Sequence, residues 1–192
     1  MINMEKKNAI INSARILFAR YGYNKTSVDE IARKSHIAKS TIYSYFRSKE
    51  DIFKEVIYQE SRILYEEINN AICKESNPSE KLRAYVITKM KYLKKMVNYY
   101  STLKDEYWEH YSFIEKIRRK STREELKIVK AILKEGVSRG DFTIKDVNLT
   151  SFAIVTAVKG LEYQWAVDFE MSKIHKNIDY LLDVLFNGIK KR

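Results

Sequence analysis

The sequence contains one cysteine, Cys73, one proline, Pro78, and five glycines among its 192 residues. A single cysteine excludes an internal disulfide framework, which fits a reducing cytoplasm. The scarcity of helix breakers, beside many Lys, Glu, Ile and Leu residues, favours an all-helical fold. No apolar run approaches the roughly 18 residues that a membrane span needs, and the start lacks the uninterrupted apolar core of a signal peptide. We therefore expect an all-α, cytoplasmic protein with no membrane segment.

Acidic residues are in the minority, and the formal net charge is +11. Residues 1–54 hold eleven Lys or Arg against five Asp or Glu, so the positive charge concentrates at the N-terminus. Such a segment attracts polyanions, with nucleic acid and an anionic membrane surface as the leading candidates. A composition that is rich in lysine everywhere is the alternative that charge alone leaves open.

Apolar residues recur at helical spacing along most of the chain. Gly22 and Gly140 are expected to end the helices before them. Three helix starts carry capping signals, namely Ser27 with Glu30, Ser48 with Asp51, and Asn77 before Pro78. The expected helices cover residues 5–21, 26–35, 38–46, 48–74, 78–97, 114–137, 147–169 and 174–189, with a short irregular helix between 99 and 113.

The first three helices, with a tight turn between the second and the third, form a helix-turn-helix pattern whose third helix would enter the major groove of DNA. Ile42 and Phe46 would anchor its inner face. From Ser35 to Ser48 there is no carboxylate to repel the DNA backbone. The outer faces carry side chains that can contact phosphates and base edges: Lys39, Ser40, Thr41, Tyr43, Ser44 and Tyr45. The alternative is a short amphipathic helix with a neutral face.

Two neighbouring helix starts offer further sites for an anion. Thr26 and Ser27 open the second helix, and Ser48 with Lys49 opens the fourth. Helix N-termini present free backbone N–H groups and the positive end of the helix dipole, which suit a phosphate. Thr26, Ser27 and Lys49 are therefore further candidates for contact with the DNA backbone.

Residues 14–57, "ARILFARYGYNKTSVDEIARKSHIAKSTIYSYFRSKEDIFKEVI", closely resemble the TetR family of bacterial repressors. The matching landmarks cover about a quarter of the chain and are Leu17-Phe18, Gly22-Tyr23, Thr26-Ser27-Val28, Ile31-Ala32, Lys39, Thr41-Ile42-Tyr43, Tyr45-Phe46 and Ser48-Lys49-Glu50. Two positions depart from the pattern. His36 stands where the turn usually has glycine, which tolerates positive φ at less cost, and Ala38 replaces a common serine cap.

The resemblance implies a two-domain repressor of nine helices that acts as a homodimer. Residues 1–47 would bind a pseudo-palindromic operator in double-stranded DNA. Residues 48–192 would bind a small-molecule effector and dimerise through the last two helices. By the family pattern, Tyr43 and Lys49 would meet phosphates, while residues 39, 40, 41, 44 and 45 would approach the groove. The long fourth helix would be the only element shared by both domains and would carry the effect of the ligand.

The helix expected over residues 147–169 is apolar on nearly every side, so it must be buried on nearly every side. A partner chain would bury it more readily than one chain alone, and the last helix would join it in a four-helix dimer interface. An ordinary intrachain core is the alternative. The predicted interface residues are Phe152, Val155, Val158, Leu161, Trp165, Ile178, Leu181, Leu182 and Leu185.

Aromatic residues with a few polar tips gather in the middle of the chain and suit an apolar or aromatic ligand. The candidate ligand-binding residues are Tyr85, Lys89, Tyr92, Met96, Tyr99, Trp108, Tyr111, Phe113 and Arg118. Lys89 and Arg118 could neutralise an anionic ligand. Core packing is the alternative for the aromatic residues, and a solvated position is the alternative for the two cations.

The sequence offers little to a metal ion or to catalysis. The three histidines, His36, His110 and His175, lack the spacing of metal ligands. Glu106, Glu109 and His110 lie close together in "EYWEH", a group more typical of a surface. No phosphate-cradling glycine loop or nucleophile elbow occurs. We therefore expect no catalytic residue, metal or cofactor, and a protein that is not an enzyme. Besides an enzyme, a basic membrane-surface or chromosome-coating protein is the second alternative to a DNA-binding regulator.

Overall fold

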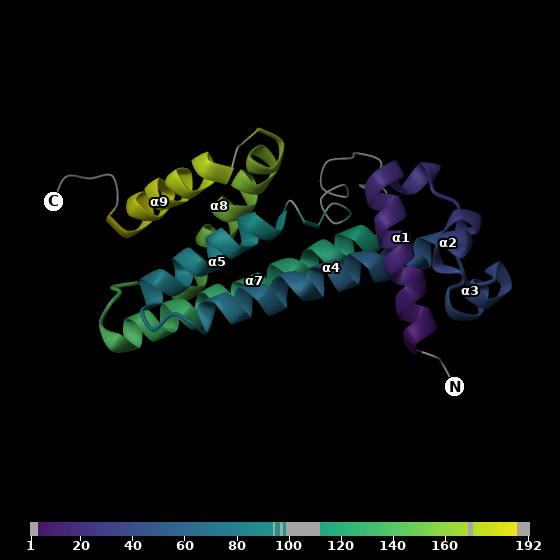
Figure 1. The fold of residues 1–192 in the computed structure, drawn as a ribbon. Coiled ribbons are helices and arrows are strands. Elements are labelled where there is room, and N and C mark those ends of the chain that lie inside the picture. The colour runs from purple at the N-terminus through teal and green to yellow at the C-terminus, as the bar shows by residue number, and fades with distance from the viewer. Residues whose placement is uncertain (1–3, 94, 97, 99–111, 169–170, 188–192) are drawn as a thin grey trace. The chain divides into compact units, whose positions relative to one another are not determined.

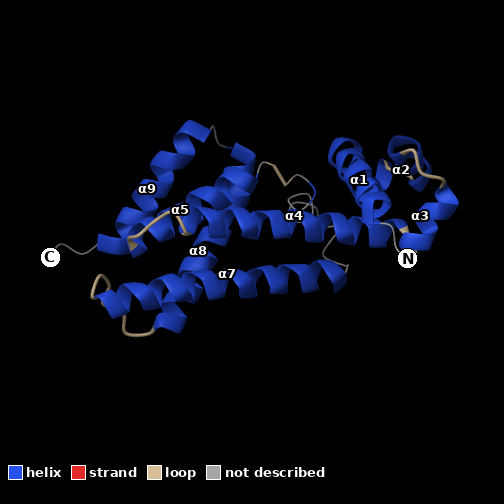
Figure 2. Ribbon diagram, turned by 60° about the horizontal axis from the view of Figure 1, so that its bottom comes forward, coloured by secondary structure: helices blue, strands red, loops and turns tan. Residues whose placement is uncertain are grey.

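The computed structural model describes residues 4–93, 95, 96, 98, 112–168 and 171–187. In that part of the chain all regular structure is helical, without a strand (Figures 1 and 2), so the all-α prediction is confirmed. The short helix expected between residues 99 and 113 falls largely outside the described residues. The helices are α1 (Met4–Lys25), α2 (Val28–Ser35), α3 (Lys39–Tyr45), α4 (Lys49–Ile72), α5 (Pro78–Leu93), α7 (Ser112–Arg139), α8 (Val147–Asp168) and α9 (Met171–Asn187).

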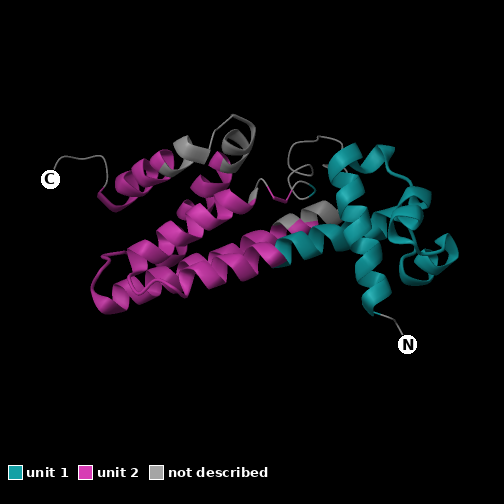
Figure 3. Cartoon of the chain, viewed as in Figure 1, with its two compact units in different colours: residues 1–62, 97–102 teal, residues 63–96, 103–192 magenta. Residues whose placement is uncertain are grey.

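Two compact units make up the chain (Figure 3). Unit 1 comprises Met1–Arg62 and Val97–Thr102, and unit 2 comprises Ile63–Met96 and Leu103–Arg192. Helix α4 begins in unit 1 and ends in unit 2. Among the described helices α4 alone has residues in both units, and Asn98, after α5, also belongs to unit 1. The division of DNA-binding from ligand-binding function between residues 47 and 48 stays a prediction.

Unit 1 is held together by aromatic and aliphatic side chains of α1 and α4. Phe18 of α1 packs edge-on against Phe53 of α4 with ring centroids 5.1 Å apart, and Tyr23 lies 5.0 Å from Phe53. Gly22 breaks the geometry of α1 with φ 80° and ψ 163°, yet the helix resumes and reaches Lys25. The predicted stop at Gly22 is therefore a kink. Also buried in this unit are Ile10, Ile11, Ala14, Ile31, Ile42, Ile52, Val56 and Ile57.

The turn between α2 and α3 depends on one left-handed residue. His36 adopts φ 55° and ψ 35°, the one positive φ outside glycine among the described residues. Its N–H donates to the Arg33 carbonyl at 3.3 Å, and the Ile37 N–H donates to the Ala32 carbonyl at 3.2 Å. For an L-residue this conformation costs about 1–2 kcal/mol. The turn thus keeps its left-handed geometry, and His36 bears the strain that glycine would avoid.

The predicted capping signals are present in the structure. The hydrogen bonds run to Ser27 Oγ from the Glu30 N–H at 3.2 Å, to Ser48 Oγ from the Asp51 N–H at 3.1 Å, and to Asn77 Oδ1 from the Ser79 N–H at 2.7 Å. Ala38 gives α3 no side-chain cap, as expected. These short-range signals determine where α2, α4 and α5 begin, so they also set which residues lead each helix.

In unit 2, α7 packs against α5 and α8, and α5 also contacts α8 and α9. Gly140 ends α7 with φ 78°, as predicted, and Phe142 then folds back over Gly136. A Cβ on Gly136 would lie 2.1 Å from Cδ2 of Phe142, so glycine is needed to admit the ring. The same ring stacks on Phe186 of α9, with centroids 6.0 Å apart. The core of the unit includes Leu82, Val86, Met90, Val129, Ile132, Leu133, Ile154, Val155, Val158, Ile178 and Leu182.

Replacing His36 by glycine should raise the free energy of unfolding by about 0.5–1 kcal/mol, because relief of left-handed strain outweighs the added entropy of the unfolded chain. The His36→Ala control removes the imidazole but keeps a Cβ, so it should give no such gain. Urea unfolding followed by circular dichroism measures both variants. Equal stability of His36→Gly and His36→Ala would show that the turn is not strained.

Candidate nucleic-acid interface

Helix α3 has seven residues, so its position depends on the side chains that dock it. Ile42 is fully buried, and Phe46, which ends the helix, is 5% exposed. The Phe46 N–H donates to the Ile42 carbonyl at 3.0 Å, and the Phe46 backbone is already extended toward α4. The structure therefore places both residues on the inner face of α3, where the sequence pattern expected its anchors.

The outer face of α3 is open to solvent. Its candidate contact residues divide into an exposed set, Lys39, Ser40, Tyr43 and Ser44, and a half-buried pair, Thr41 and Tyr45. Tyr43 is the most exposed of the aromatic residues here, at 48%. The Ser44 hydroxyl donates to the Thr41 carbonyl at 2.6 Å, which leaves its oxygen as an acceptor for a base amino group. DNA contact by these residues stays a prediction.

Thr26 is a candidate that the structure turns inward. It is 2% exposed, and its hydroxyl lies 2.8 Å from the Gly22 carbonyl and 3.3 Å from the Leu17 carbonyl. The single hydroxyl proton is thereby used within unit 1, where it satisfies carbonyls at the kink of α1. The buried hydroxyl therefore serves the α1–α2 turn, and the predicted contact of Thr26 with the DNA backbone, which rested on the N–H groups of the helix start, stays a prediction.

Ser27 and Glu30 form a reciprocal capping box at the start of α2. The Ser27 N–H and hydroxyl donate to Glu30 Oε2 at 2.7 and 2.8 Å. These hydrogen bonds, the backbone one first, lower the pKa of the Glu30 carboxyl. A carboxylate of the chain itself thus occupies the N–H and the hydroxyl of Ser27. Ser27 itself is exposed, and its contact with DNA stays a prediction.

Lys49 lies in the first turn of α4 and points back to the α1–α2 turn. Its Nζ donates to the Tyr23 carbonyl at 2.9 Å and to the Thr26 carbonyl at 3.1 Å, and it lies 4.3 Å from the centre of the Tyr23 ring. Burial lowers the pKa of this ammonium. The ammonium of Lys49 thus ties the start of α4 to the α1–α2 turn with two of its three protons, and its contact with a DNA phosphate stays a prediction.

A buried polar cluster in unit 2 surrounds two candidate ligand-binding residues, Tyr85 and Lys89. Both donate hydrogen bonds to Glu125 Oε2, from Tyr85 Oη at 2.7 Å, and all three residues are at most 2% exposed. Lys159 Nζ lies 4.0 Å from the other carboxylate oxygen and donates to Thr122 Oγ1. The charge of Lys89 is balanced by Glu125, which corrects the expectation that Lys89 would neutralise an anionic ligand. The sequence pattern missed Glu125, Lys159 and Thr122.

The remaining ligand candidates do not form a described site. Tyr92 is half-buried and Met96 is buried. A hydrogen bond to the Glu67 carboxylate raises the pKa of the Tyr92 hydroxyl. Tyr99, Trp108 and Tyr111 lie outside the described residues, as do the side chains of Phe113 and Arg118. Their part in ligand binding therefore stays a prediction.

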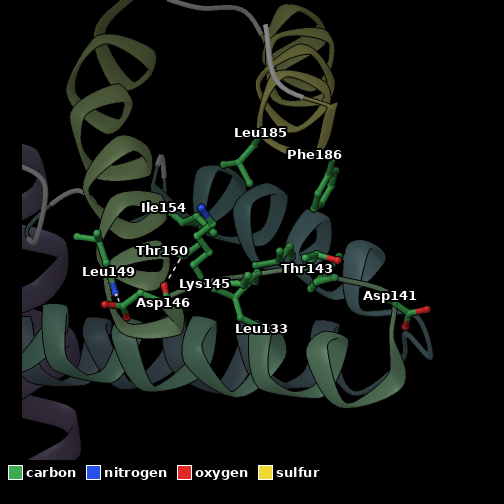
Figure 4. Close-up of a pocket in the computed structure, with 13 residues that line it drawn as sticks. Leu133, Asp141, Thr143, Lys145, Asp146, Leu149, Thr150, Ile154, Leu185 and Phe186 are labelled. Atoms are coloured by element: carbon green, nitrogen blue, oxygen red, sulfur yellow. Dashed lines mark hydrogen bonds between the residues drawn. The ribbon is translucent and has the colours of Figure 1, made fainter. Parts of the chain in front are cut away.

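A hollow of about 630 Å³ opens in unit 2 beside the connection from α7 to α8 (Figure 4). Leu133, Ile154 and Phe186 supply apolar walls. At its edge, Asp146 Oδ1 accepts hydrogen bonds from two backbone N–H groups at the start of α8, at 2.8 and 3.0 Å. The described candidates Tyr85, Lys89, Tyr92 and Met96 do not line this hollow, whereas Leu185, predicted for the dimer interface, does.

The residues predicted for a dimer interface lie in different environments. Four of them, Val155, Val158, Ile178 and Leu182, are at most 5% exposed within the single chain. They belong to the intrachain core, which corrects the expectation that their side chains meet a partner. Phe152 is 55% exposed, whereas Leu161, Leu181 and Leu185 are half-buried and the Trp165 side chain lies outside the description.

One face of α8 is exposed and carries no charge. Its residues share one side of the helix and are Leu149, Phe152, Ala153, Thr156, Ala157 and Gly160. A Cβ added at Gly160 would meet no atom within 4 Å, so the face is open at that end as well. Solvent-facing helix surfaces are normally rich in charged side chains, and this face therefore marks the part of α8 that a partner would cover.

Across the described ranges, no group of three or more His, Cys, Asp or Glu side chains is placed to hold a metal ion. Among the helices of those ranges, none has the length and apolarity to cross a membrane.

Both parts of the chain are similar to known proteins. Residues 10–56 match the family model for bacterial regulatory proteins of the tetR family, and residues 60–191 match the model for the C-terminal region of QacR-like proteins. The HTH-type transcriptional regulator QacR of Staphylococcus aureus is 28% identical over 194 residues, which cover 98% of this chain and all of QacR.

Solved structures agree with this relationship. A candidate regulator of fatty acid metabolism from Clostridium perfringens is 29% identical, with a TM-score of 0.69 over 96% of this chain and all of that one. FadR of Bacillus subtilis, solved with stearoyl-CoA, has a TM-score of 0.76 at 23% identity over 95% of this chain and 99% of FadR. The chain is a DNA-binding transcriptional regulator of the TetR family, with a C-terminal region like that of QacR.

Two substitutions should separate a structural lysine from a phosphate-contacting tyrosine. Lys49→Met removes two hydrogen bonds to carbonyls and should lower the free energy of unfolding by about 1–3 kcal/mol. Tyr43→Phe should leave unfolding unchanged and weaken binding to every duplex alike, because phosphate contacts carry no sequence information. Urea unfolding and fluorescence anisotropy with two unrelated duplexes give both readouts. A stable Lys49→Met variant, or a changed base preference in Tyr43→Phe, would contradict these roles.

Proposed function

We propose that this protein is a sequence-specific repressor of transcription that acts in the cytoplasm and whose operator affinity is changed by a small apolar or aromatic ligand. The observation that carries DNA reading is the exposed outer face of α3. That face combines Lys39, hydroxyl groups and Tyr43, and no carboxylate lies between Ser35 and Ser48. A rigidly docked helix with this surface suits the major groove.

Homodimerisation is supported by the uncharged face of α8. The small residues Ala153, Ala157 and Gly160 would let a partner helix approach closely, since the distance between packed helices depends on the side chains at the contact. Phe152 would then be desolvated at the interface. A two-fold dimer would present two α3 helices to successive major grooves about 34–36 Å apart, which requires a pseudo-palindromic operator.

The class of ligand is supported by the buried cluster around Glu125. Because Lys89 already neutralises this carboxylate, the cluster needs no charged ligand group to be stable. FadR of Bacillus subtilis, which shares the fold, was solved with stearoyl-CoA. An acyl chain is therefore the first apolar ligand to test.

Two parts of the chain that join the units could carry the effect of a ligand from unit 2 to unit 1. One is α4, and the other is the segment after α5 that contains Asn98. Within unit 1 the Asn98 amide is buried and donates to Glu60 Oε1 at 2.7 Å and to the Arg15 carbonyl at 3.2 Å. A ligand that displaces α5 would therefore act on α1 and α4 through Asn98. Its effect is limited by its difference in affinity for the two states.

Selection of duplexes from a random pool by the purified protein tests the proposed function. We expect enrichment of a pseudo-palindrome whose half-sites lie about 10 base pairs apart, centre to centre. Recovery of all duplexes alike at the same salt concentration would contradict sequence-specific regulation and would favour a basic chromosome-coating protein.

The selected duplex also serves to test the ligand. Stearoyl-CoA should change the affinity of the protein for this duplex, and free coenzyme A, which lacks the acyl chain, is the matched control. An affinity that stearoyl-CoA leaves unchanged excludes the acyl ligand. An equal effect of free coenzyme A would show that the head group is recognised instead of the chain.

Phe152→Glu should convert the dimer to a monomer and abolish binding to the full pseudo-palindrome, because it places a charge in an interface that water must leave. Its unfolding midpoint in the monomeric state should stay unchanged, since Phe152 is exposed in the single chain. Ser138→Glu adds the same charge at an exposed position of α7 and should stay dimeric. Sedimentation equilibrium measures the outcome, and a dimeric Phe152→Glu variant would contradict the α8 interface.

A further inference from the structure

The outer face of α3 has a single charged side chain, and that charge is held by a neighbouring helix. Between Ser35 and Phe46 the only Lys, Arg, Asp or Glu is Lys39. Its Nζ lies 2.8 Å from Oδ2 of Asp29, which belongs to the first turn of α2. Although α3 itself has no acidic residue, α2 places the Asp29 carboxylate on the same surface.

The start of α2 favours a carboxylate at Asp29. Asp29 stands in the first turn of α2, where the positive end of the helix dipole favours an anion. The capping box next to it ties Glu30 to Ser27, so Glu30 does not compete for Lys39. The turn at His36 fixes α3 against α2, and the buried Ile42 prevents α3 from sliding.

The pair is exposed, with side-chain exposures of 48% for Lys39 and 62% for Asp29. An exposed ion pair contributes little to stability. It does restrict direction, because a free lysine on a four-carbon stem could reach many phosphates. An ammonium has three protons, so one can stay on Asp29 while the others meet DNA.

We propose that Asp29 determines specificity in DNA recognition by holding the Lys39 ammonium toward one contact in the groove. This inference rests on DNA reading by α3. The carboxylate acts in two ways: it directs Lys39, and it repels phosphates that would otherwise attract this lysine in any register. Specificity of this kind comes from weakening the wrong complexes as well as from strengthening the right one.

Loss of the carboxylate should therefore strengthen binding to DNA of arbitrary sequence. In the Asp29→Asn variant, Lys39 can neutralise a phosphate at each half-site. The plot of log affinity against log salt should become steeper by up to about 1.8 for the dimer, at about 0.9 for each phosphate neutralised. The ratio of affinities for the selected duplex and an arbitrary duplex should fall by about tenfold for each half-site, the size of one lost base contact.

The experiment compares the wild type, Asp29→Asn, Lys39→Met and the double variant by fluorescence anisotropy from about 50 to 200 mM salt. The probes are the duplex selected by the wild-type protein and a duplex of the same length with arbitrary sequence. Glu55→Gln is the matched control. Glu55 pairs with Lys7 in unit 1, so the substitution removes the same charge from an ion pair that does not include Lys39. Asp29→Asn should gain affinity for the arbitrary duplex well beyond Glu55→Gln.

The gain should vanish when Lys39 is absent, so Asp29→Asn should have no effect in the Lys39→Met background. A gain that persists there, or one that Glu55→Gln equals, would show that Asp29 acts only through its negative charge and would overturn the inference. Unchanged discrimination by Asp29→Asn would overturn it as well. Failure of the wild type to prefer its selected duplex would instead refute the proposed function.

Discussion

Burial of Ile42 and Phe46 is the constraint on which the candidate DNA-reading surface depends. A helix of seven residues cannot be stable alone, so α3 exists because these two side chains dock it in unit 1. Its outer residues can face solvent only because the inner ones are buried. The left-handed turn at His36 then sets the direction in which α3 leaves α2. Anchoring, turn and exposed surface are thus parts of one arrangement.

The local elements of this arrangement could be predicted because they depend on neighbours in the sequence. The capping box of Ser27 and Glu30 and the left-handed turn position of His36 are set within a few residues. The side-chain directions of Lys49 and Thr26 could not be predicted, for a different reason. Spacing places both residues at helix starts, but the direction of a long lysine and the burial of a threonine depend on carbonyls of α1 and of the turn after it that only the folded unit brings near.

Contacts between distant segments also limited the predictions for unit 2. A helix that is apolar on nearly every side predicts burial, but the sequence does not divide its faces between its own chain and a partner. The structure assigns Val155 and Val158 to the intrachain core and leaves Phe152 exposed. Likewise, Lys89 suggested a free cation, because its partner Glu125 lies 36 residues away on another helix. Charge balance inside a core is a property of the fold.

The most direct test of the central claim, that the exposed face of α3 meets DNA while Lys49 supports the unit from within, is the reactivity of individual lysines. Acetylation of the protein with and without its selected duplex, followed by mass spectrometry, reports each lysine separately. The account predicts that DNA protects Lys39, that Lys49 reacts slowly in both states, and that the 72% exposed Lys127 of α7 reacts rapidly in both. Equal reactivity of Lys39 with and without DNA would contradict it.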